Sequence, residues 1–92
     1  MKFEVGKLYL VDWLDHCSFT ASKWRDFEDV NELEPQICST AGFVTKVQKN
    51  HIIISGTQSS KSLGPKDRNY TGELLILKSC ILKSKKISLK GW

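Results

Sequence analysis

The stretch AGFVTKVQKNHIIISG, residues 41–56, constrains the fold more than any other part of the sequence. Ala41, Phe43 and Val47 recur at the period of a half-buried strand. Three consecutive isoleucines follow, and such a short β-branched run is typical of a buried strand. The stretch therefore predicts a hairpin that turns at Lys49-Asn50, with the rest of the chain adding strands beside it.

Gly42 lies inside the first strand of this hairpin. A glycine at such a position predicts a bulge, a sharp bend, or the close approach of another backbone. The apolar side chains of the hairpin and of a later strand predict one core. Its expected members are Phe43, Val47, Ile52, Ile54, Leu75 and Leu77.

Residues 7–15, KLYLVDWLD, predict the first strand. Tyr9, Val11 and Trp13 share one face and leucines occupy most of the other, so both faces are largely apolar. Such a strand is central, or bent as in a small closed barrel, or has an oligomer interface on its outer face.

Two more strands are predicted near the end of the chain. Residues 72–78 carry a continuous apolar run, and residues 81–89 mix lysines with apolar residues. Lysines suit an edge strand because positive charge discourages pairing with another chain. A tight turn at Ser79-Cys80, such as one turn of 3₁₀ helix, would join the two strands.

Two longer connections separate the predicted strands. Residues 23–34 place apolar side chains, beginning with Trp24, at a spacing of three, which predicts a short helix that packs onto the sheet. Pro35 ends this helix. Residues 57–72 are rich in Ser, Gly, Pro and Asn and lack periodicity, which predicts a long loop of the kind that is usually functional or disordered.

The composition is that of one small domain. The 92 residues are 40% hydrophobic, and no apolar run approaches the ~20 residues that span a bilayer. The first residues contain acids within their apolar stretch and no small-residue cleavage site, so we expect neither a signal peptide nor a membrane segment. Cys17, Cys38 and Cys80 include no Cys-x-x-Cys pair, which predicts reduced thiols in a cytoplasm.

Charge is unevenly distributed along the chain. Residues 1–60 carry six basic and eight acidic residues, whereas residues 61–92 carry eight basic and two acidic residues. A basic region of this kind attracts phosphates. The alternative is a solvated face that keeps the protein soluble.

The order of these elements resembles that of an SH3-like small barrel. The resemblance rests on VDWLD, on the hairpin, and on GELLILKSCILKSKKI, where LKSCI fits the 3₁₀ turn that joins the last two strands of such barrels. We therefore expect a single mainly β domain, residues 1–92, that forms a small five-stranded SH3-like barrel. The short helix would lie in its first long loop.

The chain also resembles a group of small, mostly uncharacterised proteins encoded by bacteriophages and prophages. The matching segments are VDWLDHCSF, then Trp24, LEPQICSTAGFV, HIIIS and GELLILKSCI, and together they cover roughly residues 8–82. The resemblance implies a virus-encoded accessory protein that acts in the cytoplasm of the infected cell.

No arrangement of residues predicts catalysis, a metal site or a cofactor. His16 and Cys17 are adjacent and so point to opposite faces of an extended chain, with no third group indicated. Asp12 and Asp15 are three apart on a strand, hence also on opposite faces. The cysteines lack a zinc-knuckle spacing. We therefore expect a binding protein rather than an enzyme.

A host protein is the first of three expected partners. Three tryptophans in so small a chain and the apolar first strand fit an aromatic-anchored interface. Self-association into a homo-oligomer would use the same feature.

An anionic nucleotide is the second expected partner. Loop backbone, a few cations and an aromatic lid can form such a pocket, and the segments SFTASKW and SSKSLGPKDRNY are expected to face each other across one barrel end. The resemblance admits one such role, the sequestration of a nucleotide signal of bacterial immunity. The candidate ligand-binding residues are Ser18, Trp24, Lys61, Lys66, Arg68 and Tyr70.

Nucleic acid is the third expected partner. Small barrels can combine exposed aromatics, on which bases stack, with basic side chains that follow the backbone. The candidate residues in the basic C-terminal region are Lys78, Lys83, Lys85 and Lys86.

Overall fold

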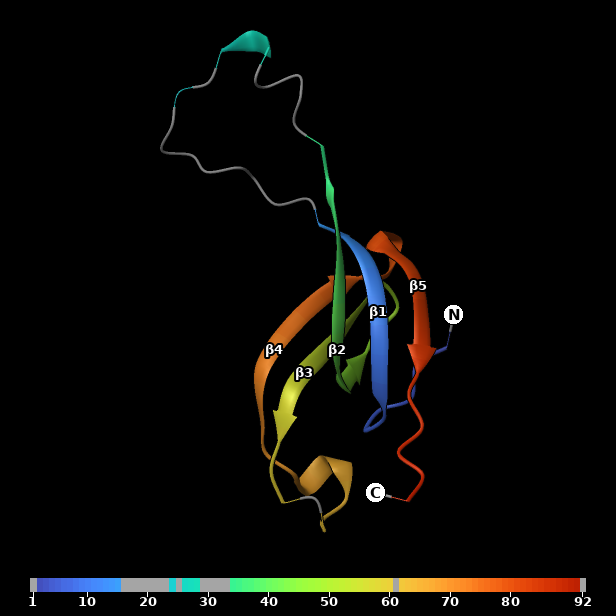
Figure 1. Cartoon of the computed structure of the whole chain (residues 1–92). Helices are drawn as coiled ribbons and strands as arrows, with labels where there is room; N and C mark the ends of the chain where they lie inside the picture. Colours follow the sequence, from blue (N-terminus) through green and yellow to red (C-terminus); the bar gives the residue numbers. More distant parts are fainter. Residues whose placement is uncertain (1, 16–23, 25, 29–33, 61, 92) are drawn as a thin grey trace.

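The computed structural model describes residues 2–15, 24, 26–28, 34–60 and 62–91. Five strands form one antiparallel sheet in the order β4-β3-β2-β1-β5 (Figure 1). The prediction of a mainly β, five-stranded domain is confirmed. The elements are β1 (Leu8–Asp15), β2 (Gln36–Val47), β3 (His51–Gln58), the 3₁₀ helix η1 (Pro65–Asp67), β4 (Tyr70–Leu77), the 3₁₀ helix η2 (Lys78–Cys80) and β5 (Ile81–Lys86).

The sheet is open, with β4 and β5 as its two edges. The predicted single turn of 3₁₀ helix, η2, joins these strands in sequence, but β5 then pairs with β1 instead of β4. Ile81 lies opposite Trp13, and Lys83 lies opposite Asp12 and forms an ion pair with it at 3.6 Å. Because β4 and β5 do not pair, hydrogen bonds do not close the sheet into the predicted barrel.

The central hairpin lies where the sequence predicts it. The Gln48 N–H donates to the carbonyl of His51 at 2.8 Å and closes the turn at Lys49-Asn50. The pairing of β2 with β3 shifts register after Val44, and Val44 is fully buried while Phe43 is only half-buried. This irregularity changes which face of β2 supplies the core.

The core is a single cluster of buried side chains from all five strands. Ile52 and Ile54 belong to it, as predicted. Val47 is partly buried and packs against it. The members of the cluster are Tyr9, Val11, Val44, Ile52, Ile54, Ile76 and Ile81.

Leu75 and Leu77 were predicted to belong to the core, and this prediction is wrong. These side chains are 52% and 47% exposed, while Ile76 between them is buried. Neighbouring residues of a strand point to opposite faces, so β4 can bury only one of the two sets. An unbroken apolar run carries no alternation that would identify the buried set.

The first strand is central, between β2 and β5. Its Tyr9 and Val11 face is buried, and Leu10 on the other face is exposed. Trp13 continues the buried face, and its indole N–H donates to the Thr40 hydroxyl at 3.0 Å.

Gly42 marks a close approach between β2 and β3. A Cβ atom at this position would lie 2.6 Å from Cγ1 of Ile54 and 2.8 Å from the carbonyl oxygen of Ser55. Since real Cβ atoms essentially never show such distances, the structure supports the close approach among the three alternatives that the sequence left open at this glycine.

The two long connections differ from their predicted extents. The predicted helix over residues 23–34 lies mostly outside the described residues; among its described residues, Phe27 and Glu28 have helical backbone. Trp24 is fully exposed, so it does not pack onto the sheet as predicted. β3 and β4 extend into the predicted 57–72 loop and leave residues 59–69 as the connection.

Two further observations concern the thiols and hydropathy. Cys38 and Cys80 form no disulfide, and Cys17 lies outside the described residues. No helix in the described ranges has the length and apolar character needed to cross a membrane.

Candidate functional site

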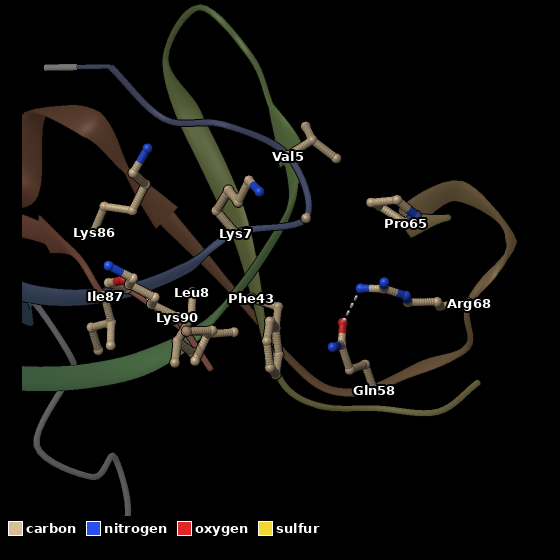
Figure 2. Close-up of a pocket in the computed structure, with 13 residues that line it drawn as sticks. Val5, Lys7, Leu8, Phe43, Gln58, Pro65, Arg68, Lys86, Ile87 and Lys90 are labelled. Atoms are coloured by element: carbon tan, nitrogen blue, oxygen red, sulfur yellow. Dashed lines mark hydrogen bonds between the residues drawn. The ribbon is translucent and has the colours of Figure 1, made fainter. Parts of the chain in front are cut away.

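A cavity of the described structure lies where β1 begins and β5 ends. Its volume is about 610 Å³, within the range of small-molecule sites in proteins. Figure 2 shows side chains around it from the N-terminal turn and the start of β1, from β2, from the end of β3 and the 59–69 connection, and from the end of β5 and the segment after it. We call this cavity the basic pocket.

The turn before β1 is held in place by backbone hydrogen bonds. The Gly6 N–H donates to the carbonyl of Val44 at 2.7 Å, and the Val44 N–H donates to the carbonyl of Lys7 at 3.0 Å. The Glu4 N–H donates to the Tyr9 hydroxyl at 2.9 Å. These bonds position Lys7 at the edge of the pocket.

A glycine allows this turn to contact η1. Gly6 has a φ of +88°, and a Cβ atom there would lie 2.5 Å from Cγ of Pro65. Both the left-handed backbone and the contact with Pro65 require glycine. The contact joins the N-terminal turn to the 59–69 connection and closes one side of the pocket.

Arg68 organises the 59–69 connection. Its Nε donates to the carbonyl of Leu63 at 2.7 Å, and its Nη1 donates to Oε1 of Gln58 at 3.2 Å. The Tyr70 hydroxyl donates to the carbonyl of Pro65 at 2.8 Å. Arg68 therefore holds its loop against β3 while its positive charge forms part of the pocket wall.

The pocket is strongly basic. No carboxylate of the described residues lines it, although Lys86 forms a half-exposed ion pair with Glu4 at 3.3 Å. Within the described part of the chain, the Lys7 and Lys90 ammonium groups have no hydrogen-bond or ion-pair partner. Like charges around one concave site raise its positive potential and attract anions. The cations are Lys7, Arg68, Lys86 and Lys90.

Apolar side chains form the rest of the pocket wall. Phe43 is half-buried on β2 and lies opposite Leu8 of β1 in the register of the sheet. Ile87 follows β5, and its N–H donates to the carbonyl of Leu8 at 2.8 Å. In Figure 2 the Phe43 ring lies between Lys90 and Arg68. The pocket therefore combines cations with an aromatic and aliphatic surface.

The candidate ligand-binding residues from the sequence are only partly brought together. Arg68 lines the basic pocket, and Tyr70 supports it through Pro65. Lys66 lines a neighbouring cavity of about 370 Å³. Ser18 and Lys61 lie outside the described residues.

Trp24 is not near the basic pocket. It belongs to the connection between Asp15 and Gln36, which form the last cross-strand pair of β1 with β2. Leu8, at the pocket, is at the other end of β1. Residues 18–23 of the first loop segment that we expected to face the second lie outside the described residues, but the strand ends that flank the two connections, Asp15 and Gln58, lie at opposite ends of the sheet (Figure 1).

The lysines that we considered for nucleic-acid binding are also dispersed. Lys86 lines the basic pocket. Lys83 is paired with Asp12, Lys85 lies opposite Leu10, and Lys78 belongs to η2. Sequence reasoning missed Lys7, Phe43 and Lys90 as pocket residues, because no local pattern shows that these three distant positions meet.

The acidic residues of β1 have structural partners. Asp12 accepts a hydrogen bond from the Ser39 hydroxyl at 2.6 Å and pairs with Lys83. Among the described residues, no three His, Cys, Asp or Glu side chains are grouped in a way that would hold a metal ion. These contacts give Asp12 a role in joining β1 to its two neighbouring strands.

Comparisons of the chain with protein-family models, curated proteins and solved structures found no match. The fold and the site together define a small mainly β domain with a basic pocket at one end of an open antiparallel sheet. The resemblance to phage-encoded proteins stays a prediction.

Proposed function

We propose that this protein is a non-enzymatic binding module on an SH3-like barrel, and that it holds a phosphate-bearing small molecule in the basic pocket. The barrel assignment is supported by the strand order β4-β3-β2-β1-β5, the long connection after β1 and the single 3₁₀ turn before β5. The pairing of β1 with both β2 and β5 brings the ends of the chain together around the pocket.

One observation carries the ligand class. Four cations from three separate segments surround an apolar surface, and no described carboxylate lines the cavity. Gathering like charges around one cavity costs electrostatic free energy, which a bound phosphate offsets. Lysine and arginine are the side chains that bind phosphate oxygens by charge-assisted hydrogen bonds. The apolar surface would cover the uncharged part of the ligand.

The biological role follows from combining this pocket with the resemblance. A phage-encoded protein that binds a nucleotide without converting it would remove that nucleotide from solution in the host cytoplasm. Sequestration of a nucleotide signal of host immunity is the role of this kind that we propose.

Two single variants, Lys7→Gln and Lys90→Gln, should each bind phosphate-bearing ligands more weakly than the wild-type protein. Each lost contact is expected to cost about 1 kcal/mol, between the value of an exposed ion pair and that of a charged hydrogen bond. Each single variant should therefore bind about fivefold more weakly in isothermal titration calorimetry with a panel of nucleotides.

Lys49→Gln is the matched control for this measurement. It removes the same charge from the hairpin turn, beyond the opposite end of β3 from Gln58 at the pocket. Equal weakening by all three substitutions would show nonspecific attraction to net charge and would contradict the proposed site.

A protein partner is the second candidate function, and a different surface favours it. Leu75 and Leu77 are exposed on the edge strand β4, beside a cavity of about 260 Å³ that Trp13 and Leu14 also line. Aromatic and aliphatic side chains at a small cavity are typical of protein-interface anchors. A host protein or a second copy of this chain would bind there.

Leu75→Lys should disrupt such an interface and leave nucleotide binding unchanged, because Leu75 does not line the basic pocket. Light scattering of the purified protein and capture from bacterial lysate would measure self-association and host binding. Leu82→Lys, an exposed leucine on the other edge strand, is the control. A monomeric protein whose captured partners are the same with and without Leu75→Lys would exclude this surface.

A further inference from the structure

The cations of the basic pocket are spread across the sheet. Arg68 is bonded to Gln58 at the end of β3, whereas Lys86 ends β5. Two strands, β2 and β1, lie between β3 and β5. Three strand spacings separate the backbones of these two strands by ~14 Å along the sheet. The Arg68 guanidinium is held by Gln58 and the Lys86 ammonium by Glu4, so the two charges lie on separate sides of the pocket in this structure.

Between these cations lies an apolar surface. Figure 2 shows Phe43 between Arg68 on one side and Lys90 on the other. Leu8, which lies opposite Phe43 in the register, extends this surface across β1. Nucleobases stack on aromatic rings, and proteins that bind single strands alternate such rings with cations that contact successive phosphates.

From this arrangement we infer that the ligand of the basic pocket contains two or more nucleotides joined by phosphodiester linkages. One phosphate contacts the Arg68 side, the next contacts the Lys86 and Lys90 side, and a base stacks on Phe43. A nucleoside triphosphate places its charges in one short run and matches this spacing less well. The inference rests on the proposed function, since it names the ligand class of the same pocket.

A series of adenine ligands of increasing size tests this inference by calorimetry at two salt concentrations. Its members are inorganic phosphate, the mononucleotide, the linear dinucleotide, the cyclic dinucleotide and a single-stranded hexanucleotide. A dinucleotide should bind at least about tenfold more tightly than the mononucleotide. Its affinity should also depend more steeply on salt, by about 0.7 log unit per log unit of salt for each added contact.

The outcomes separate this inference from the proposed function. Equal affinity for mononucleotide and dinucleotide would overturn the inference and leave the phosphate pocket standing. Binding of no phosphate-bearing ligand would overturn both. If the inference holds, a hexanucleotide that binds no more tightly than a dinucleotide identifies a free dinucleotide as the source, and a further gain in affinity identifies a polynucleotide.

Lys86→Gln provides a second, independent readout. It should reduce the affinity ratio of dinucleotide to mononucleotide about fivefold, because it removes one cation on the far side from Arg68. Lys83→Gln is the matched control, since Lys83 lies on the same strand, pairs with Asp12 and does not line the pocket. Thermal melting would establish that both variants fold. An unchanged ratio in folded Lys86→Gln would overturn the inference.

Discussion

Ile54→Ala is expected to destabilise the fold by about 2–5 kcal/mol, the range for truncation of a large buried side chain. Ile54 is 1% exposed, lies opposite Val44 on one neighbouring strand and Leu74 on the other, and belongs to the core cluster. A domain of this size has a free energy of unfolding near the low end of the usual range of about 5–15 kcal/mol. The variant should therefore be largely unfolded at modest denaturant concentration.

Leu75→Ala is the control for this prediction. Leu75 is a neighbour of Leu74 on β4 but is 52% exposed, so its truncation should cost about 1 kcal/mol or less. Urea denaturation followed by circular dichroism measures both free energies of unfolding. If Leu75→Ala lowered the free energy of unfolding as much as Ile54→Ala does, the inward face of β4 would have been assigned wrongly.

The second large effect is expected at Gly42. Alanine there would place its Cβ 2.6 Å from Cγ1 of Ile54 and 2.8 Å from the backbone oxygen of Ser55. The isoleucine side chain can rotate away, but the strand carrying the Ser55 carbonyl has to move as a whole. Overpacking of this kind costs about 1–3 kcal/mol or more, and Gly42→Ala should lower the melting temperature accordingly.

Gly56→Ala is the matched control, because a Cβ atom at Gly56 has no neighbour within 4 Å and its φ is not positive. Its effect should be near zero or slightly stabilising, since alanine restricts the unfolded chain. Thermal melting of the two variants in the same buffer compares them directly. Similar melting temperatures for both would contradict the close contact between β2 and β3.

The positions of the strands could be predicted because their signals are local. A hairpin turn at Lys49-Asn50, an isoleucine-rich strand, and a short link at Ser79-Cys80 each depend on a few neighbouring residues. Which face of β1 points inward stayed open in the sequence, because Tyr9 and Val11 alternate with leucines and both faces are largely apolar; the structure buries Tyr9 and Val11. The inward face of β4 was predicted wrongly, because leucine and isoleucine run through it without alternation.

The candidate site was predicted only in part. Arg68 was identified because it lies in a long basic connection. Lys7, Phe43 and Lys90 were missed because their meeting depends on two pairings of β1, with β2 and with β5. Trp24 was wrongly included among the candidate ligand-binding residues, because the residues of a loop do not show at which end of the sheet the loop lies.

By itself, the sequence determined that this chain is a mainly β domain with a central hairpin, an irregularity or close approach at Gly42 and a basic C-terminal region. Side-chain alternation, β-branching and glycine act within a few residues, so these properties are encoded locally. Only the tertiary structure decided that Ile76 and Val44 are buried and that Lys7, Arg68, Lys86 and Lys90 surround one cavity. The register of β4 against β3, which pairs Ile76 with Ile52, the register shift after Val44 and the pairing of β5 with β1 accompany these results, and each involves contacts between residues that are not neighbours in the sequence.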